Sequence, residues 1–327
     1  MALFAGHSYT YSIMRYLVTG GAGFIGSALC HRLAAEGRKV VVLDDFSTGD
    51  PERLAAIRAA VTLIEGDIRD RAAVDRAMRG VGTVFHEAAL PSVARSVEDP
   101  LASNDVNVSG TLTVLESARR AGVRRLVYAA SSSAYGDTPA LPKREDMKPS
   151  PRSPYAIGKL AGEHYAEAYF RLFGLETVSL RYFNVFGPRQ DPRSHYAAVI
   201  PRFITAALAG APATIYGDGL QSRDFTFVDN VVDANLRAAE ASGAPGHVFN
   251  IACGRRYTLL DLLAMIAAAL GRDAPVPPVH EPDRPGDVRH SLADIAAARA
   301  ALGYEPAIDM QEGIRRTVDW YRQAAAR

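Results

Sequence analysis

Tyr155 and Lys159 are the two side chains whose types and spacing best suit proton transfer in this chain. They stand four residues apart in the run Ser-Pro-Tyr-Ala-Ile-Gly-Lys, so on a helix the phenol and the ammonium share one face. A free phenol has a pKa of about 10 and is a poor base at neutral pH. A neighbouring ammonium lowers that pKa, so we expect Lys159 to activate Tyr155. The same spacing is common in helices that only pack, and the rest of the sequence decides between the two interpretations.

A hydroxyl group is expected beside this pair. The apolar run 125–130 ends in Ser131-Ser132-Ser133, where a strand would stop. A hydroxyl at Ser131 can bridge a substrate oxygen and the Tyr155 phenol and so stabilise developing charge. Ser132 and Ser133 can contact substrate as well, or they can only cap the turn after the strand.

A glycine-rich loop near the start of the chain predicts a site for a dinucleotide. Gly20, Gly23 and Gly26 follow the apolar run 16–18 and precede a helical pattern. Glycines are needed where the backbone turns tightly, approaches phosphate and packs a helix close to a strand. The N-terminus of the helix then offers free N–H groups to the pyrophosphate.

Acidic residues after the second apolar run indicate which dinucleotide binds. The run 39–43 ends in Asp44 and Asp45, about 20 residues beyond the glycines, where a carboxylate holds a ribose 2′-hydroxyl. An acid there repels a 2′-phosphate, so NAD is favoured over NADP. The alternative is that Asp44 only ends a strand at a turn. With NAD bound, the positive nicotinamide ring would lower the pKa of Tyr155 further, and Lys159 can hold the adjoining ribose.

Composition and charge narrow the class of protein. The chain has 327 residues, enough for two lobes, and is 48% hydrophobic and 22% charged, as in ordinary globular proteins. Its 37 Lys and Arg residues balance 36 Asp and Glu residues, so we expect neither nucleic acid nor a membrane as partner. No run of about 18 apolar residues suits a membrane span. The two cysteines, Cys30 and Cys253, predict reduced thiols in a cytoplasmic protein and no metal site.

Alternating apolar runs and helical patterns predict an α/β fold. The strand-like runs fall at 16–18, 39–43, 61–64, 83–86, 125–130 and 178–182. Strands that alternate with helices favour a doubly wound parallel sheet of the Rossmann type, with ligands at the carboxyl ends of its strands. Loops rich in Pro, Gly and Arg after Phe186 predict a smaller mixed α/β substrate lobe.

These patterns give provisional boundaries. An NAD-binding domain is expected over 14–185 with a returning segment at about 229–252, and a substrate lobe over 186–228 and 253–327. Residues 1–13 read as a disordered extension or a mis-assigned start without function. Two long helices, at about 104–121 and 155–173, can pair with a second subunit as a four-helix bundle, or they can only cover the sheet.

Further motifs give the chain a family resemblance. They are Arg181-Tyr182-Phe183-Asn184-Val185-Phe186-Gly187, Tyr216-Gly217-Asp218-Gly219, Ser222-Arg223-Asp224-Phe225, Val228-Asp229-Asn230 and Arg284-Pro285-Gly286-Asp287. Together with the glycine loop and the residues Ser131, Tyr155 and Lys159, they make the chain resemble the UDP-sugar 4-epimerases among the extended short-chain dehydrogenases/reductases. The resemblance extends from Met14 to Tyr321.

The resemblance implies a reaction without net redox change. Tyr155 would take the proton of the sugar C4 hydroxyl while NAD takes the C4 hydride. The 4-keto sugar would turn about its pyrophosphate tether and receive the hydride on its opposite face. The resemblance also implies a homodimer through the four-helix bundle.

Binding roles follow from the same resemblance. NAD is expected to contact Gly20, Gly23, Phe24, Ile25, Gly26, Asp44, Asp45, Asp67, Ile68, Ala88, Ala89, Asn107, Tyr155, Lys159 and Tyr182. The UDP-sugar is expected to contact Ser131, Ser132, Ser133, Asn184, Ala198, Val199, Tyr216, Arg223, Arg284 and Ser291. Asn184 and the two arginines would hold UDP, the arginines by bidentate contacts with the diphosphate, unless they form surface ion pairs instead. Tyr216 and the 198–199 stretch would line the uracil pocket.

Two departures from related enzymes indicate the subclass. Sugar 4,6-dehydratases end this strand in Thr-Asp-Glu, and UDP-glucuronate decarboxylases have Glu at the position of Ser133; the serine run offers no acid, which disfavours both. Ser291 matches the family's gatekeeper position, where enzymes restricted to UDP-glucose and UDP-galactose tend to have Tyr. A small residue leaves room for a 2-N-acetyl group. UDP-GlcNAc and UDP-GalNAc are therefore the expected substrates, with the plain UDP-hexoses also accepted.

Three other functions stay open on the sequence. A UDP-glucuronate 4-epimerase would use the same residues on a sugar with a carboxylate at C6. A catalytically silent, NAD-sensing module would share the scaffold, although such modules usually lose the Tyr–Lys pair. A net dehydrogenase or reductase would consume NAD stoichiometrically.

Overall fold

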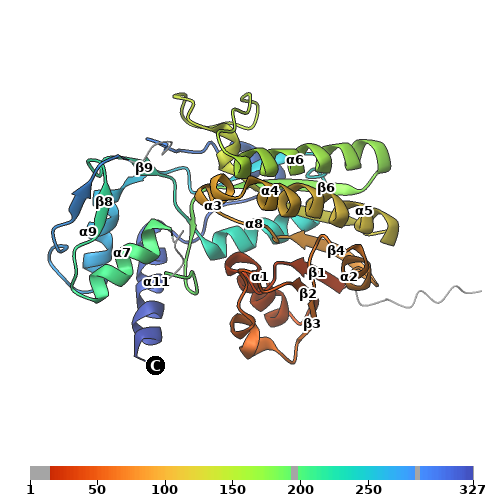
Figure 1. The fold of residues 1–327 in the computed structure, drawn as a ribbon, viewed down its shortest axis with the longest axis horizontal. Coiled ribbons are helices and arrows are strands. Elements are labelled where there is room, and N and C mark those ends of the chain that lie inside the picture. The colour runs from red at the N-terminus through yellow and green to blue at the C-terminus, as the bar shows by residue number, and fades with distance from the viewer. Residues whose placement is uncertain (1–14, 193–197, 284–287, 327) are drawn as a thin grey trace, which may run out of the picture.

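A seven-stranded parallel sheet forms the centre of the computed structural model, which describes residues 15–192, 198–283 and 288–326 (Figure 1). The strand order is β11-β6-β5-β4-β1-β2-β3. These strands are β1 (Arg15–Thr19), β2 (Lys39–Asp44), β3 (Val61–Glu65), β4 (Val81–His86), β5 (Arg125–Ser131), β6 (Glu176–Tyr182) and β11 (Val248–Ile251). Each predicted strand-like run lies within one of them, and the α/β doubly wound fold is confirmed.

Helices cover both faces of the sheet and bury two separate apolar cores. One core packs Leu29 and Leu33 of α1 (Phe24–Ala35) with side chains of α8 (Val228–Glu240) and α10 (Ala296–Leu302). The other packs α2 (Arg71–Ala77), α5 (Thr111–Ala121) and α6 (Pro154–Phe173) against the opposite face. Strands buried on both faces explain why the sequence shows near-continuous apolar runs there.

The helix predicted at about 155–173 is α6, and its ends have clear local causes. Ser153 caps it, since its hydroxyl accepts a hydrogen bond from the Ala156 N–H at 3.2 Å, and Pro154 takes the first helical position. Gly174 ends it in the left-handed conformation, with φ +72°. The helix therefore begins one residue before Tyr155, at the carboxyl end of the sheet.

The helix predicted at about 104–121 differs in detail. It consists of α4 (Pro100–Asn104), a π-helical turn over Asp105–Gly110, and α5. Within the turn, the Asn107 side chain accepts a hydrogen bond from the Leu90 N–H at 2.9 Å and donates one to the Leu90 carbonyl at 3.0 Å. The wider π-helical turn directs the Asn107 side chain towards the loop that contains Leu90.

A smaller lobe with a third apolar core lies beside the carboxyl ends of the strands (Figure 1). Its helices are α7 (Val199–Leu208), α9 (Leu259–Ala269) and α11 (Met310–Ala325). Its short strands are β7 (Val185–Phe186), β8 (Thr214–Tyr216), β9 (Ser222–Arg223), β10 (Thr226–Phe227), β12 (Tyr257–Thr258) and β13 (Val279–Glu281). The remaining short helices are η1 (Pro51–Ile57), α3 (Val93–Glu98) and η3 (Ser132–Tyr135).

The chain passes between the two lobes more than once. After β8, β9 and β10 it returns as α8 and β11, which extends the main sheet beside β6. It then leaves again for α9. The domain boundaries given above stay a prediction.

A buried ion pair joins α6 to the sheet. The Arg181 guanidinium donates to the Glu163 carboxylate at 3.0 Å from Nε and 2.7 Å from Nη2, and the two side chains are only 4% and 3% exposed. The guanidinium also lies 4.7 Å from the centre of the Tyr135 ring. Removing one partner of such a pair leaves an uncompensated buried charge.

We predict that Glu163→Ala lowers the free energy of unfolding by about 3–5 kcal/mol. The measurement is urea-induced unfolding at pH 7, followed by circular dichroism. The matched control is Glu312→Ala, which removes a carboxylate paired with Arg315 on the exposed face of α11 and should leave the unfolding midpoint nearly unchanged. Equal midpoints for the two variants would contradict the role given to the buried pair.

Candidate active site

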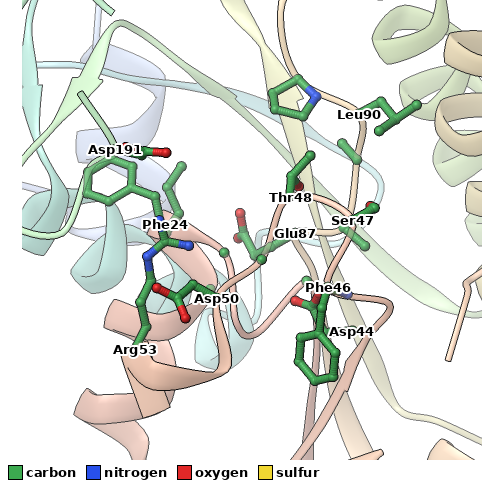
Figure 2. A pocket seen from close by; sticks show the side chains of 18 of the residues that line it. Phe24, Asp44, Phe46, Ser47, Thr48, Asp50, Arg53, Glu87, Leu90 and Asp191 are labelled. Atoms are coloured by element: carbon green, nitrogen blue, oxygen red, sulfur yellow. Dashed lines mark hydrogen bonds between the residues drawn. The ribbon is translucent and has the colours of Figure 1, made fainter. Parts of the chain in front are cut away.

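A cleft of about 1520 Å³ runs along the carboxyl ends of the strands (Figure 2). Of the residues expected to contact NAD, all but Asn107 line it. They are Gly20, Gly23, Phe24, Ile25, Gly26, Asp44, Asp45, Asp67, Ile68, Ala88, Ala89, Tyr155, Lys159 and Tyr182. Asn107 is buried beneath the cleft wall, where its amide holds Leu90 in place.

The glycine loop is shaped for close approach to phosphate. Gly20 has φ +68°, and a Cβ there would lie 2.7 Å from the Ala88 backbone. A Cβ on Gly26 would collide with the Gly20 carbonyl oxygen. Gly23 is the N-cap of α1 and supplies no side-chain cap, so the first-turn N–H groups face the cleft without a side-chain partner at the cap. This bare helix N-terminus fits the pyrophosphate of a dinucleotide.

The acidic residues after β2 both end the strand and line the cleft. The Asp44 carboxylate accepts hydrogen bonds from the Ala22 N–H at 2.8 Å and the Phe46 N–H at 2.9 Å. Burial raises the pKa of Asp44, while these backbone hydrogen bonds lower it. Each carboxylate oxygen still has a lone pair for a ribose hydroxyl. The two interpretations offered for Asp44 are therefore compatible.

Lys159 is a buried cation at the other end of the cleft. Its side chain is 4% exposed, Nζ donates to the Ala129 carbonyl at 2.8 Å, and the ammonium lies 5.1 Å from the centre of the Tyr128 ring. Burial lowers the pKa of Lys159 to about 8, against the opposing fields of Glu87 and Glu163. The ammonium is therefore still the main form at pH 7.

The balance of forces on the Tyr155 phenol differs from the expectation. Burial raises its pKa, the side-chain hydrogen bond with Ser131 lowers it, and the field of Glu87 raises it, so that the net direction is upward. Lys159 is not among the groups that shift the pKa of Tyr155 in the chain alone, and its ammonium donates to the Ala129 carbonyl. Ser131 is the group of the chain that favours the phenolate.

Ser131 also organises the turn after β5. Its oxygen accepts hydrogen bonds from the Ser133 N–H at 3.2 Å and the Ser133 hydroxyl at 2.9 Å. The suggestion that Ser132 or Ser133 caps this turn was wrong, because the capping oxygen belongs to Ser131, the residue that ends the strand. Ser132 and Ser133 lie half-buried in the turn.

Residues expected to hold the substrate gather where the small lobe meets the sheet. The Asn184 side-chain amide donates to the Asp224 carbonyl at 3.3 Å and to the Ser291 hydroxyl at 3.4 Å. Arg223 is the last residue of β9, and its Nη1 donates to the Ser222 and Arg289 carbonyls.

The remaining substrate candidates lie on two elements of the small lobe. Ala198 lines the cleft and Val199 begins α7. Tyr216 ends β8, with the Arg202 guanidinium 5.9 Å from its ring centre. Arg284 lies outside the described residues.

Sequence reasoning missed the role of Asp224. Its buried carboxylate accepts hydrogen bonds from the N–H groups of Cys253 at 3.0 Å, Gly254 at 3.0 Å and Ala293 at 3.2 Å. It thereby ties the chain after β11 and the segment before α10 to the Asn184 region. The signal was its place within the Ser222-Arg223-Asp224-Phe225 motif.

Sequence reasoning also missed Glu87, which directly follows β4. Its carboxylate points into the cleft (Figure 2) and accepts a hydrogen bond from the Tyr182 hydroxyl at 2.8 Å. The Tyr182 hydroxyl in turn accepts one from the Asn235 amide at 2.8 Å. Its position between a predicted strand and Ala88-Ala89 was the available signal.

Residues 15–192, 198–283 and 288–326 contain neither a metal-binding cluster nor a helix suited to a bilayer. No group of three or more His, Cys, Asp or Glu side chains there is arranged to hold a metal ion. No helix in those ranges has the length and apolar character required to cross a bilayer.

Comparison with known proteins places the chain in a family. The profile of the NAD dependent epimerase/dehydratase family matches residues 16–252, and the chain belongs to that family. It is 44% identical over 318 residues to a UDP-glucose 4-epimerase of Mycolicibacterium smegmatis, which covers 94% of this chain and 99% of that protein.

Two solved structures share the fold and bear on the ligands. The UDP-N-acetylglucosamine 4-epimerase of Methanobrevibacter ruminantium, in complex with UDP-N-acetylmuramic acid, superposes with a TM-score of 0.90 at 38% identity, covering 95% of this chain and 99% of that one. The UDP-glucose 4-epimerase of Thermus thermophilus, in complex with NAD, has a TM-score of 0.86 at 40% identity, covering 95% and 100%.

Proposed function

We propose that this protein is an NAD-dependent UDP-sugar 4-epimerase that interconverts UDP-GlcNAc and UDP-GalNAc, and also accepts UDP-glucose and UDP-galactose. One observation carries the proposal: Tyr155 and the buried Lys159 ammonium line one end of a cleft whose other end holds Asp44 and the glycine loop, and Ser131 lowers the pKa of the Tyr155 phenol. The similarity to UDP-sugar 4-epimerases supports the same function.

The cleft residues divide the chemistry between them. Bound NAD would supply the acceptor, and then the donor, for the hydride of the sugar C4. Tyr155 accepts the C4 hydroxyl proton and gives it back after the sugar has turned, so protons and electron pairs balance over one turnover. Ser131 donates to the oxygen on which charge develops. The Lys159 ammonium, buried at the same end of the cleft, would hold the ribose next to the nicotinamide.

Substrate choice is inferred from the small lobe. The Asn184 amide donates to the Ser291 hydroxyl at 3.4 Å, and a serine occupies far less space there than a tyrosine would. This supports room for a 2-N-acetyl group. Arg223 and Arg284 are the proposed ligands of the diphosphate, because guanidinium groups bind phosphates in bidentate fashion.

Replacing the phenol tests the proposed base. We predict that Tyr155→Phe lowers kcat about 10²–10⁴-fold for conversion of UDP-GlcNAc, since the variant cannot accept the C4 proton. Products are resolved by ion-pair chromatography after incubation without added NAD. The matched control is Tyr165→Phe, a half-exposed phenol on the same helix outside the cleft lining, which should keep full activity.

The wild-type assay separates the rival functions. Turnover of UDP-glucuronate alone would identify a UDP-glucuronate 4-epimerase. Absence of product with every UDP-sugar, together with bound NAD, would identify an NAD-sensing module. Consumption of one NAD for each sugar would identify a net dehydrogenase.

The gatekeeper position yields a selective prediction. Ser291→Tyr should abolish turnover of UDP-GlcNAc and retain turnover of UDP-glucose, because the phenol would fill the space assigned to the acetamide. Ser291→Ala is the control and should turn over both. The measurement is kcat/KM on the two substrates, and equal losses on both with Ser291→Tyr would count against the gate.

We also infer that two copies of the chain associate through α6, one of the two helices expected in the bundle, together with α3 and α4, because α5, in the other expected helix, exposes no large apolar side chain. These helices pack side by side and expose large apolar side chains: Val97 on α3, Leu101 on α4 and Ile157, Leu172 and Phe173 on α6. Leu101 is 81% exposed and Leu172 is 73% exposed. Neighbouring helices with apolar outer faces are typical of a helix-bundle interface.

The mass in solution tests this interface. Sedimentation equilibrium should give twice the mass of one chain, and Leu101→Glu should shift the equilibrium towards the single chain. The control Leu220→Glu places the same charge on an exposed leucine of the small lobe and should leave the mass unchanged. A wild-type protein with the mass of one chain would refute the dimer.

A further inference from the structure

Glu87 is an acidic side chain in the cleft that the proposed reaction does not use. Its backbone N–H donates to the Thr19 carbonyl at 3.1 Å, which holds it next to the strand that feeds the glycine loop. Its carboxylate accepts from the Tyr182 hydroxyl at 2.8 Å, and Asn235 fixes that hydroxyl from behind at 2.8 Å. The Glu87 carboxylate therefore lines the cleft in a fixed position, where its charge can act on a bound ligand.

Among the described residues, no positively charged side chain forms an ion pair with the Glu87 carboxylate, and its hydrogen bond comes from a neutral phenol. The cation whose field acts on Glu87 is Lys159, whose ammonium donates to the Ala129 carbonyl. Burial raises the pKa of Glu87 to about 7, while Tyr182 and Lys159 lower it. The carboxylate is therefore about half ionised at pH 7 and mainly ionised above it.

The field of this carboxylate reaches the reacting end of the cleft. Glu87 accepts a hydrogen bond from Tyr182, which pairs with Ser131 across β5 and β6, so its carboxylate lies near the Tyr155–Lys159 end of the cleft, and it shifts the pKa of both side chains. The groups that face it are Lys159 and Tyr155 from α6, Tyr182 from β6 and Cys30 from α1. Since the glycine loop takes the pyrophosphate and Asp44 the adenine-side ribose, the nicotinamide half belongs at this end.

We propose that Glu87 is the residue that holds the bound dinucleotide oxidised between turnovers. This inference rests on the proposed function, because it concerns the state from which that reaction starts. The oxidised nicotinamide ring is positive and the reduced ring is neutral, so a nearby negative charge favours the oxidised form. Reduction transfers a hydride, two electrons and one proton with a net charge of −1, to that ring, and this net negative charge is harder to add beside a carboxylate.

This role accounts for the fixed position of the Glu87 carboxylate, which is bonded to Tyr182 and through it to Asn235. An epimerase that loses its 4-keto sugar before the hydride returns is left with reduced cofactor and cannot begin another turnover. A carboxylate that disfavours the reduced form favours return of the hydride to the sugar. Glu87 thereby protects the resting enzyme without touching the sugar.

The reduction potential of the bound cofactor tests the role. Purified enzyme loaded with NAD is equilibrated, without any sugar, against a two-electron dye couple at pH 7.5, and NADH is read from its absorbance. We expect Glu87→Gln to raise the bound NADH/NAD ratio about tenfold at a given dye potential, which equals about 30 mV for a two-electron couple.

Two further variants keep this result interpretable. Glu87→Asp retains the charge and should stay within twofold of the wild type, which guards against misfolding of the Gln variant. Glu65→Gln removes an exposed carboxylate at the end of β3 and should also stay within twofold.

The outcomes separate this inference from the proposed function. A Glu87→Gln ratio within twofold of the wild type overturns the inference alone, even if the protein epimerises UDP-GlcNAc. Equal shifts in Glu87→Gln and Glu65→Gln would also overturn it, since the effect would then be one of net charge. A protein that retains no NAD would overturn both.

Discussion

Burial of the Lys159 ammonium is the constraint on which the site depends. A buried cation is costly unless polar groups compensate it. Here the Ala129 carbonyl and the face of the Tyr128 ring supply that compensation, and both come from β5. Helix α6 must therefore lie very close to this strand. Gly162 allows that approach, because a Cβ there would collide with the Tyr128 hydroxyl, which itself donates to the Lys159 carbonyl.

The same constraint explains the state of the phenol. Burial raises the pKa of the Tyr155 phenol and the field of Glu87 raises it further, so Tyr155 stays protonated in the chain alone, while the Lys159 ammonium is turned towards β5. Activation of the base thus depends on Ser131 and on the positive ring that the cleft is shaped to receive. A phenol that becomes basic only in the loaded cleft avoids unproductive proton exchange with water.

Much of the fold and part of the site could be predicted from the sequence. The strands can be predicted because they are runs of Val, Leu and Ile buried on both faces, and the glycine loop and the Tyr155–Lys159 spacing are local patterns. Contacts between distant segments cannot be predicted from local patterns. Asn184 and Ser291 are 107 residues apart, and Asp224 makes its bonds to segments 29 to 69 residues away. The hydrogen bond that links Glu87 to Tyr182 depends on the order of strands in the sheet, which periodicity alone leaves undetermined.

The late arrival of β11 has a consequence for how the polypeptide matures. During synthesis the strand β6 is complete by residue 182, yet the strand that covers its open edge is not made until residue 251. Over that interval the nascent sheet presents an unpaired edge, the feature through which chains most readily aggregate. Helix α10, which packs against β11, is synthesised later still. We therefore expect any dependence on chaperones to be a property of the unfinished chain. It should end once the last third of the chain has left the ribosome.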